Sequence, residues 1–170
     1  MKFYSTKDKT YRVSFEEALL SGLAPDGGLF MPEFFPKFSP KEKRDFTEKN
    51  FAEAAFEIAQ KFVNIEIPRR DLKEIIFDAY DFPIPLHEFN QREYVMELFH
   101  GPTLAFKDVA ARFMARCVSY FLKLQKSHRL VLVATSGDTG GAVGHGFLGV
   151  ENTQVIILYP KGGVSPIQES

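Results

Sequence analysis

Cysteine is almost absent from this chain. The one thiol, Cys117, cannot form a disulfide within the chain and suits a reducing compartment. Excess charge of one sign is also missing, because the formal net charge is −1, and this argues against a broad nucleic-acid-binding surface. Residues 1–8 carry no apolar segment of the secretory type, and no apolar run approaches membrane-spanning length. We therefore expect a cytoplasmic protein with no nucleic-acid or membrane partner.

The sequence also lacks the motifs of several kinds of functional site. The spacing of histidine, cysteine, aspartate and glutamate resembles no metal site, and no Ser-His-acid arrangement can be inferred. The glycine-rich stretch 135–141 is not a Walker motif, because no Gly-Lys-Ser/Thr closes it. Its glycine spacing does not fit the dinucleotide fingerprint either. The 170 residues are enough for one ordinary domain, or for one and a half small ones.

Residues 1–82 are predicted to form a mainly helical region. Ser14 and Ser39 each precede a glutamate three residues later, which is the capping-box pattern of a helix start. Further helices are expected to begin at Asn50 and at Asp71. The turn 25–28 contains two glycines, which favour a tight turn over close approach to a ligand. Two prolines then break the pattern, so a boundary is placed after residue 82.

Residues 83–170 are predicted to begin an α/β domain that is incomplete. Strands are expected at 94–99, 130–134 and 154–159, with helices between them. This alternation predicts a parallel sheet, and the continuous apolar run 130–134 predicts a strand buried on both faces. The helix that begins near Asp108 should bury one apolar face: Val109, Phe113, Cys117, Tyr120, Phe121 and Leu124.

The first joint between a strand and a helix, residues 97–108, carries a lysine. Ligands of open α/β sheets usually bind at such joints. An uncharged lysine amine condenses with aldehydes, and burial or a helix N-terminus disfavours its charged form. Phe106 and Leu104 offer apolar surroundings to Lys107, whereas Asp108 either approaches the amine or caps the helix. The alternative is an ordinary surface lysine at a helix start.

The second joint, residues 135–141, offers hydroxyl groups, backbone N–H groups and a helix N-terminus. This combination binds anions such as carboxylate or phosphate. The alternative is a tight turn with ordinary caps at Asp138 or Thr139. We expect the two joints to form the halves of one site. His100 is expected to make a structural hydrogen bond, and His87 to have no partner; Lys161 either contacts an anionic substrate or is solvated.

Five segments carry a resemblance to a known family. The segment 97–108, Glu-Leu-Phe-His-Gly-Pro-Thr-Leu-Ala-Phe-Lys-Asp, resembles the cofactor-lysine segment of threonine synthase, a pyridoxal-phosphate enzyme of fold type II. Four others are similar to that family: 13–18, 22–29, 134–140 and 158–168. They occur in the family's order and cover nearly the whole chain.

The resemblance implies a fold, a reaction and a set of site residues. The fold would be the tryptophan synthase β-like α/β class, and the reaction would convert O-phospho-L-homoserine and water to L-threonine and phosphate. Lys107 would hold pyridoxal 5'-phosphate as an internal aldimine and act as acid and base. Phe106 and Asp138 would also contact the cofactor. The substrate would be bound by Ser136, Gly137, Thr139 and Lys161. The chain departs from the family at Gly141 and Gly163, where serine and arginine are frequent.

Members of this family are considerably longer. The chain is therefore expected to be the N-terminal portion of the enzyme, to be inactive alone, and to have the missing C-terminal part as its partner. Three alternatives stay open: a related lyase acting on another phosphorylated amino acid or amino alcohol, a non-catalytic interaction module, and a generic anion-binding α/β domain.

Overall fold

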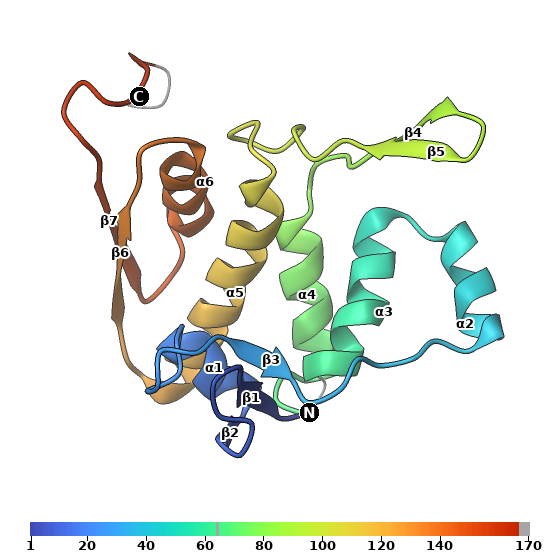
Figure 1. Ribbon diagram of the computed structural model, residues 1–170, viewed down its shortest axis with the longest axis horizontal. Coiled ribbons are helices and arrows are strands. Elements are labelled where there is room, and N and C mark those ends of the chain that lie inside the picture. Colours follow the sequence, from blue (N-terminus) through green and yellow to red (C-terminus); the bar gives the residue numbers. More distant parts are fainter. Residues whose placement is uncertain (64, 167–170) are drawn as a thin grey trace. The chain divides into compact units, whose positions relative to one another are not determined.

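The computed structural model describes residues 1–63 and 65–166 and divides into two compact units between residues 77 and 78 (Figure 1). The first unit contains, in order, β1 (Phe3–Ser5), β2 (Arg12–Val13), α1 (Phe15–Ser21), β3 (Phe30–Pro32), α2 (Pro40–Asp45), a 3₁₀ turn η1 (Phe46–Glu48), α3 (Phe51–Val63) and most of α4 (Arg69–Ala79). The second contains β4 (Leu86–Asn90), β5 (Glu93–Met96), α5 (Lys107–Gln125), β6 (Arg129–Ala134), α6 (Asp138–Phe147) and β7 (Thr153–Leu158).

The first unit has a small antiparallel sheet that the mainly helical prediction missed. Its strand order is β2-β1-β3, with Phe3 opposite Val13 and Tyr4 opposite Met31. Each strand has only two or three residues, which is too short to show the alternation that identifies a strand. The sheet is held by the turn before β3. There Asp26 accepts hydrogen bonds from the Gly28 amide and the buried Ser5 hydroxyl, both at 2.8 Å.

Three of the four expected helix starts are confirmed. Ser14 accepts from the Glu17 amide, Ser39 forms a full capping box with Glu42, and Asn50 exchanges the equivalent pair of bonds with Glu53. The prediction for Asp71 is wrong, because α4 already begins at Arg69, directly after a proline. The inward positions predicted for this helix are all buried: Leu72, Ile75, Ile76 and Ala79.

The expected strand 94–99 is shorter and pairs differently. β5 ends at Met96 and lies antiparallel to β4, so the two strands form a hairpin outside the parallel sheet. Arg92 adopts a positive φ of 76°, and the chain reverses beside it. A run of strand-forming residues predicts a strand but does not identify its partner, which here is the preceding segment.

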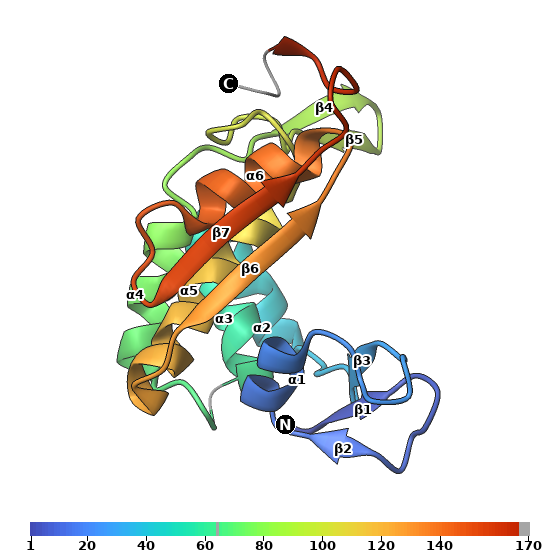
Figure 2. The same cartoon turned by 90° about the vertical axis from the view of Figure 1, so that its left-hand side faces the viewer.

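The parallel arrangement is confirmed for β6 and β7, which pair in register from Arg129 opposite Thr153 to Ala134 opposite Leu158 (Figure 2). α6 covers one face, because Ile157 lies against Gly140 and Gly144. The other face is exposed, with Leu132 62% and Ile156 46% accessible. The prediction that 130–134 is buried on both faces is therefore wrong in this chain: a single helix layer covers only one.

The buried stripe of α5 differs from the predicted one. Cys117 and Phe121 are buried as expected, but Leu124 is 62% exposed. The other buried residues of this helix are two alanines, two charged residues and two apolar residues outside the predicted set: Ala111, Ala115, Asp108, Arg112, Val118 and Leu122. Apolar periodicity does not detect this stripe, since alanine is small and the two charged groups are buried through hydrogen bonds.

Arg112 is buried because it completes the end of α4. Its guanidinium donates to the carbonyls of Ala79 at 2.7 Å and Asp78 at 2.9 Å, and to the Asp81 carboxylate at 2.7 Å. The last carbonyls of a helix have no partner within the helix, so this side chain satisfies groups that would otherwise need water. It ties α5 to the segment that leads into the hairpin.

α5 and α6 run in the same direction. Gly146 lies beside Ala111, and further along both segments the Ser119 hydroxyl donates to the Glu151 carbonyl at 2.9 Å. Their N-termini therefore lie at the end of this unit where β6 and β7 have their carboxyl ends (Figures 1 and 2). Both predicted joints are at this end.

Candidate functional site

The first joint is a compact turn fixed by a buried carboxylate. Asp108 is fully buried, and it accepts from the Thr103 amide at 2.9 Å and from the Thr103 hydroxyl at 2.6 Å. Gly101 approaches it so closely that a Cβ there would lie 2.5 Å from Asp108 Oδ2. Leu104, between them, has a left-handed φ of 58°. Two roles were considered for Asp108, pairing with the lysine and capping the helix, and the structure supports neither. Its carboxylate instead holds the turn together through its hydrogen bonds to Thr103.

Lys107 is the first residue of α5 and is half-buried. Its Nζ lies 4.1 Å from the centroid of the Phe106 ring, a cation–π contact. Phe106 itself is 59% exposed. Among the residues that the structure describes, no carboxylate forms an ion pair with Lys107. The amine thus lies against an aromatic ring, and no carboxylate in residues 1–63 and 65–166 is its counter-ion.

The second joint is organised by Thr135, its first residue, which was not among the predicted site residues. Its hydroxyl accepts from the Gly137 and Gly140 amides and donates to the Gly137 carbonyl, at 3.1–3.2 Å. A Cβ on Gly140 would collide with the Thr135 methyl group. Threonine two residues before a loop glycine is a recognisable turn signal, so the sequence contained this information.

Three predicted site residues on this loop, Ser136, Asp138 and Thr139, are exposed, and Gly137 is half-buried. α6 begins at Asp138 with Gly137 at its N-cap, and the Thr135 hydroxyl accepts from the Gly140 amide in its first turn at 3.2 Å. The alternative of an ordinary cap at Asp138 or Thr139 is therefore wrong. The joint therefore presents a helix N-terminus, the kind of place where anions bind in proteins.

Lys161 follows β7 in an exposed turn closed by the bond from the Gly163 amide to the Pro160 carbonyl, at 2.8 Å. The Thr135 amide donates to the Leu158 carbonyl at 2.9 Å, so the loops after β6 and β7 begin side by side. The structure thus brings all seven predicted site residues to one end of the second unit: Phe106, Lys107, Ser136, Gly137, Asp138, Thr139 and Lys161. Within the described part of the chain, no hydrogen bond or ion pair given by the structure links Lys107 to the second joint.

The histidines near the first joint are structural. His100 Nε2 lies 2.5 Å from a Glu97 carboxylate oxygen, which confirms the expected hydrogen bond. His87 lies 3.6 Å from the same carboxylate, so the prediction that it has no partner is wrong. The hairpin that brings them together was not recognised from the sequence. No group of three potential metal ligands occurs in the described residues.

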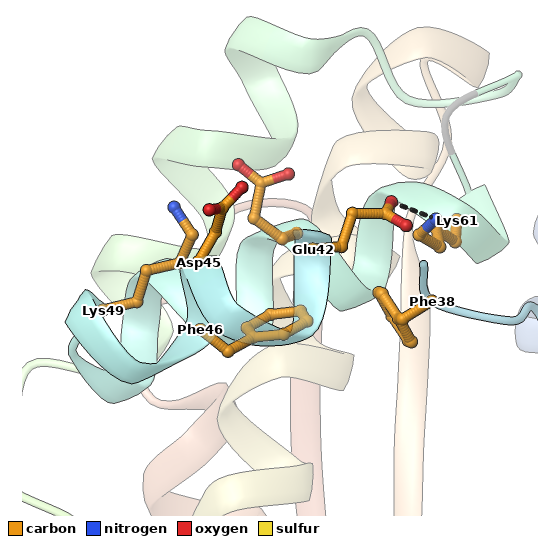
Figure 3. Close-up of a pocket in the computed structure, with 7 residues that line it drawn as sticks. Phe38, Glu42, Asp45, Phe46, Lys49 and Lys61 are labelled. Atoms are coloured by element: carbon orange, nitrogen blue, oxygen red, sulfur yellow. Dashed lines mark hydrogen bonds and ion pairs between the residues drawn. The ribbon is translucent and has the colours of Figure 1, made fainter. Parts of the chain in front are cut away.

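A separate pocket of about 150 Å³ lies in the first unit (Figure 3). It is lined by Phe38, Glu42, Asp45, Phe46, Lys49, Glu57 and Lys61. Lys61 donates to Glu42 at 2.6 Å, and this bond together with those from Ser39 lowers the pKa of Glu42 to about 2. Glu57 lies 3.6 Å from Arg69. Two carboxylates of the pocket, Glu42 and Glu57, are therefore paired with basic side chains of the protein itself. None of the residues that line the pocket belongs to the predicted site.

Comparison with known proteins gives consistent matches along the chain. Residues 2–80 match a family model described as the threonine synthase N terminus. Threonine synthase of Escherichia coli is 42% identical over 169 residues, which are 99% of this chain and 39% of that protein. The chain is similar to threonine synthases. It matches the N-terminal portion of these proteins and spans about 39% of the length of this relative.

Solved threonine synthases share the fold. The crystal structure of PLP-bound threonine synthase from Brucella melitensis superposes with a TM-score of 0.93 at 42% identity, covering 99% of this chain and 37% of that one. The yeast threonine synthase gives 0.89 at 38% identity, with 99% and 37% covered. The predicted α/β class, with a helical N-terminal region and part of a parallel sheet, is thereby confirmed. No helix in the described residues is long and apolar enough to cross a membrane.

Proposed function

We propose that the chain contributes the N-terminal part of an enzyme that converts O-phospho-L-homoserine and water to L-threonine and phosphate with pyridoxal 5'-phosphate, in the cytoplasm. The similarity to threonine synthases supports the reaction. The observation that carries the proposal for this chain is the placement of Lys107, which lies at a helix N-terminus and pairs with no carboxylate of the described residues.

The residues present fit the cofactor. Lys107 would hold it through its amine, Phe106 would offer an exposed ring beside it, and Asp138 lies at the start of α6. When bound, pyridoxal phosphate supplies an electron sink for charge that develops on the substrate carbons. The protein's share is binding, orientation and proton transfer.

The chain's own groups have distinct proposed tasks. The Lys107 amine would accept and return protons at the substrate carbons. The hydroxyls of Ser136 and Thr139 would bind the substrate carboxylate, with Gly137 between them on the same loop and the α6 N-terminus beside it. Lys161, beside this loop, would contact an anionic substrate group. Asp138 is expected to serve the cofactor side, since its carboxylate would repel a carboxylate substrate.

The proposed reaction also requires residues from a C-terminal part of the enzyme. Because the chain spans about 39% of its relatives, we propose that it does not turn over substrate alone. The exposed apolar face of β6 and β7 is the surface on which the C-terminal part of the same enzyme would pack. We place the start of the cofactor-binding region at residue 83, and the N-terminal region at 1–82.

Cofactor titration tests the role of Lys107. Pyridoxal phosphate added to the chain should give a visible absorbance band that Lys107→Ala abolishes and Lys123→Ala keeps. Lys123 is a suitable control because it lies at the other end of the same helix and is exposed. A band of equal strength in all three proteins would contradict the assignment.

A further inference from the structure

We propose that Thr103 and Asp108 form a clasp that positions Lys107 and keeps the Asp108 carboxylate away from its amine. The inference rests on the proposed role of Lys107. It assigns Thr103 and Asp108 as positioning residues that act through Lys107.

The clasp is a buried carboxylate with both oxygens engaged. Asp108 has no accessible surface, and each of its oxygens accepts from a different donor of Thr103, at 2.9 Å and 2.6 Å. A buried carboxylate is tolerated only when its acceptors are satisfied. The five-residue separation closes the segment 103–108 into a loop whose last turn is the start of α5.

Two backbone features show that this loop is held in place by its surroundings. Gly101 lies against Asp108 in a space that admits no Cβ, since one would lie 2.5 Å from Oδ2. Leu104 has a left-handed φ of 58° although its side chain is 72% exposed, so side-chain packing does not explain the strained backbone. Strained residues persist where neighbouring contacts determine the conformation, and they cluster at functional sites.

The consequence for Lys107 follows from adjacency. Lys107 and Asp108 are consecutive, so a carboxylate released from Thr103 would be the nearest anion along the chain to the lysine amine. Pairing with it would engage the amine in an ion pair and draw it away from its position on the Phe106 ring. With Thr103 in place, the Asp108 carboxylate is hydrogen-bonded within the turn, and the Lys107 amine lies on the Phe106 ring.

The variants that separate positioning from general stability are threonine substitutions. Thr103→Val keeps the side-chain volume and removes the hydroxyl, whereas Thr103→Ser restores it. Thr153→Val is the matched control, because the Thr153 hydroxyl also makes a structural bond in the same unit, to the Val150 carbonyl at 2.8 Å, but at the start of β7.

The readout is the reactivity of Lys107 relative to Lys123 in the full 170-residue chain. Trace acetylation with acetic anhydride and peptide mass spectrometry give this ratio without any cofactor. A parallel series uses pyridoxal phosphate and borohydride trapping. All proteins are labelled at a temperature where circular dichroism shows them folded, so that lost stability alone does not change the ratio.

The clasp predicts that the acetylation ratio falls about fivefold in Thr103→Val, while Thr103→Ser and Thr153→Val stay within about twofold of the wild type. An unchanged ratio in Thr103→Val, or an equal fall in Thr153→Val, would overturn the inference. The trapping series reports separately on the proposed function: if the wild type shows no preference for Lys107 over Lys123, the cofactor role fails, and the acetylation ratio still decides the clasp.

Discussion

Lys107 is surrounded by residues whose side chains have other tasks. Asp108 braces the preceding turn, Phe106 lies under the amine, and Leu104 takes a conformation that non-glycine residues rarely adopt. The sequence allowed Lys107 to be selected by its neighbours and by family resemblance. It could not show that Asp108 is buried, because burial of an aspartate depends on a hydrogen bond to a threonine five residues away.

The left-handed backbone of Leu104 leads to a prediction about the free energy of unfolding. Leu104→Asn should stabilise the chain by about 0.5–1 kcal/mol, since asparagine tolerates the left-handed region better and the leucine side chain is largely exposed. Urea unfolding of the two proteins measures the difference. A destabilised Leu104→Asn would mean that the leucine side chain contributes packing that outweighs the backbone strain.

Burial of two acidic groups predicts a loss of stability at high pH. Burial raises the pKa of the Cys117 thiol from 9.0 to about 12, and burial together with the nearby Cys117 raises that of Tyr80 from 10.0 to about 12. Both folded-state values exceed the unfolded ones, so stability is full below pH 9 and falls as pH rises toward 12. Urea midpoints should therefore decline above pH 9, and less steeply in Cys117→Ala. Identical pH profiles for the variant and the wild type would contradict this.

At the scale of elements, predictions based on local signals were the most accurate. The caps at Ser14, Ser39 and Asn50 depend on residues three positions apart, and all three are confirmed. The strand 94–99 failed because its partner is set by a chain reversal near Arg92. The prediction that Leu124 lies on the buried face of α5 is wrong. The helix packs through its alanines, one of which contacts Gly146 of α6, and through the buried charged residues Asp108 and Arg112.

The contact between α5 and α6 depends on one small residue. A Cβ on Gly146 would lie 3.1 Å from the Ala111 backbone, which cannot move aside easily. We expect Gly146→Ala to destabilise the chain by about 1–3 kcal/mol through overpacking. Gly141→Ala, in the same helix with nothing within 4 Å, should instead stabilise it by about 0.5–1 kcal/mol. Thermal unfolding of both variants checks the pair, and equal shifts would contradict the packing argument.

At the scale of the whole molecule, the parallel pair β6–β7 determines where function is sought. Its carboxyl ends and the N-termini of α5 and α6 lie together, which the alternation of strands and helices predicted. Whether a strand is covered on both faces depends on residues distant in the sequence or in another polypeptide. For that reason the apolar sequence of 130–134 did not reveal that one face of β6 is exposed in this chain.

The exposed face predicts association of the isolated chain. Leu132 and Ile156 are 62% and 46% exposed on adjacent strands, and such patches recruit dyes and other apolar surfaces. The double variant Leu132→Lys/Ile156→Lys should bind the dye ANS about threefold less than the wild type and sediment with less self-association. Unchanged dye binding would place the exposed apolar surface elsewhere.

The central claim is that Lys107 and the loop after β6 serve one ligand. Titration of the ¹⁵N-labelled chain with pyridoxal phosphate, followed by NMR, tests it directly. The account predicts that the amides of 106–108 and of 136–140 shift together with one saturation curve, and that both responses vanish in Lys107→Ala. Shifts confined to the lysine segment, with the loop amides unchanged at saturation, would contradict it.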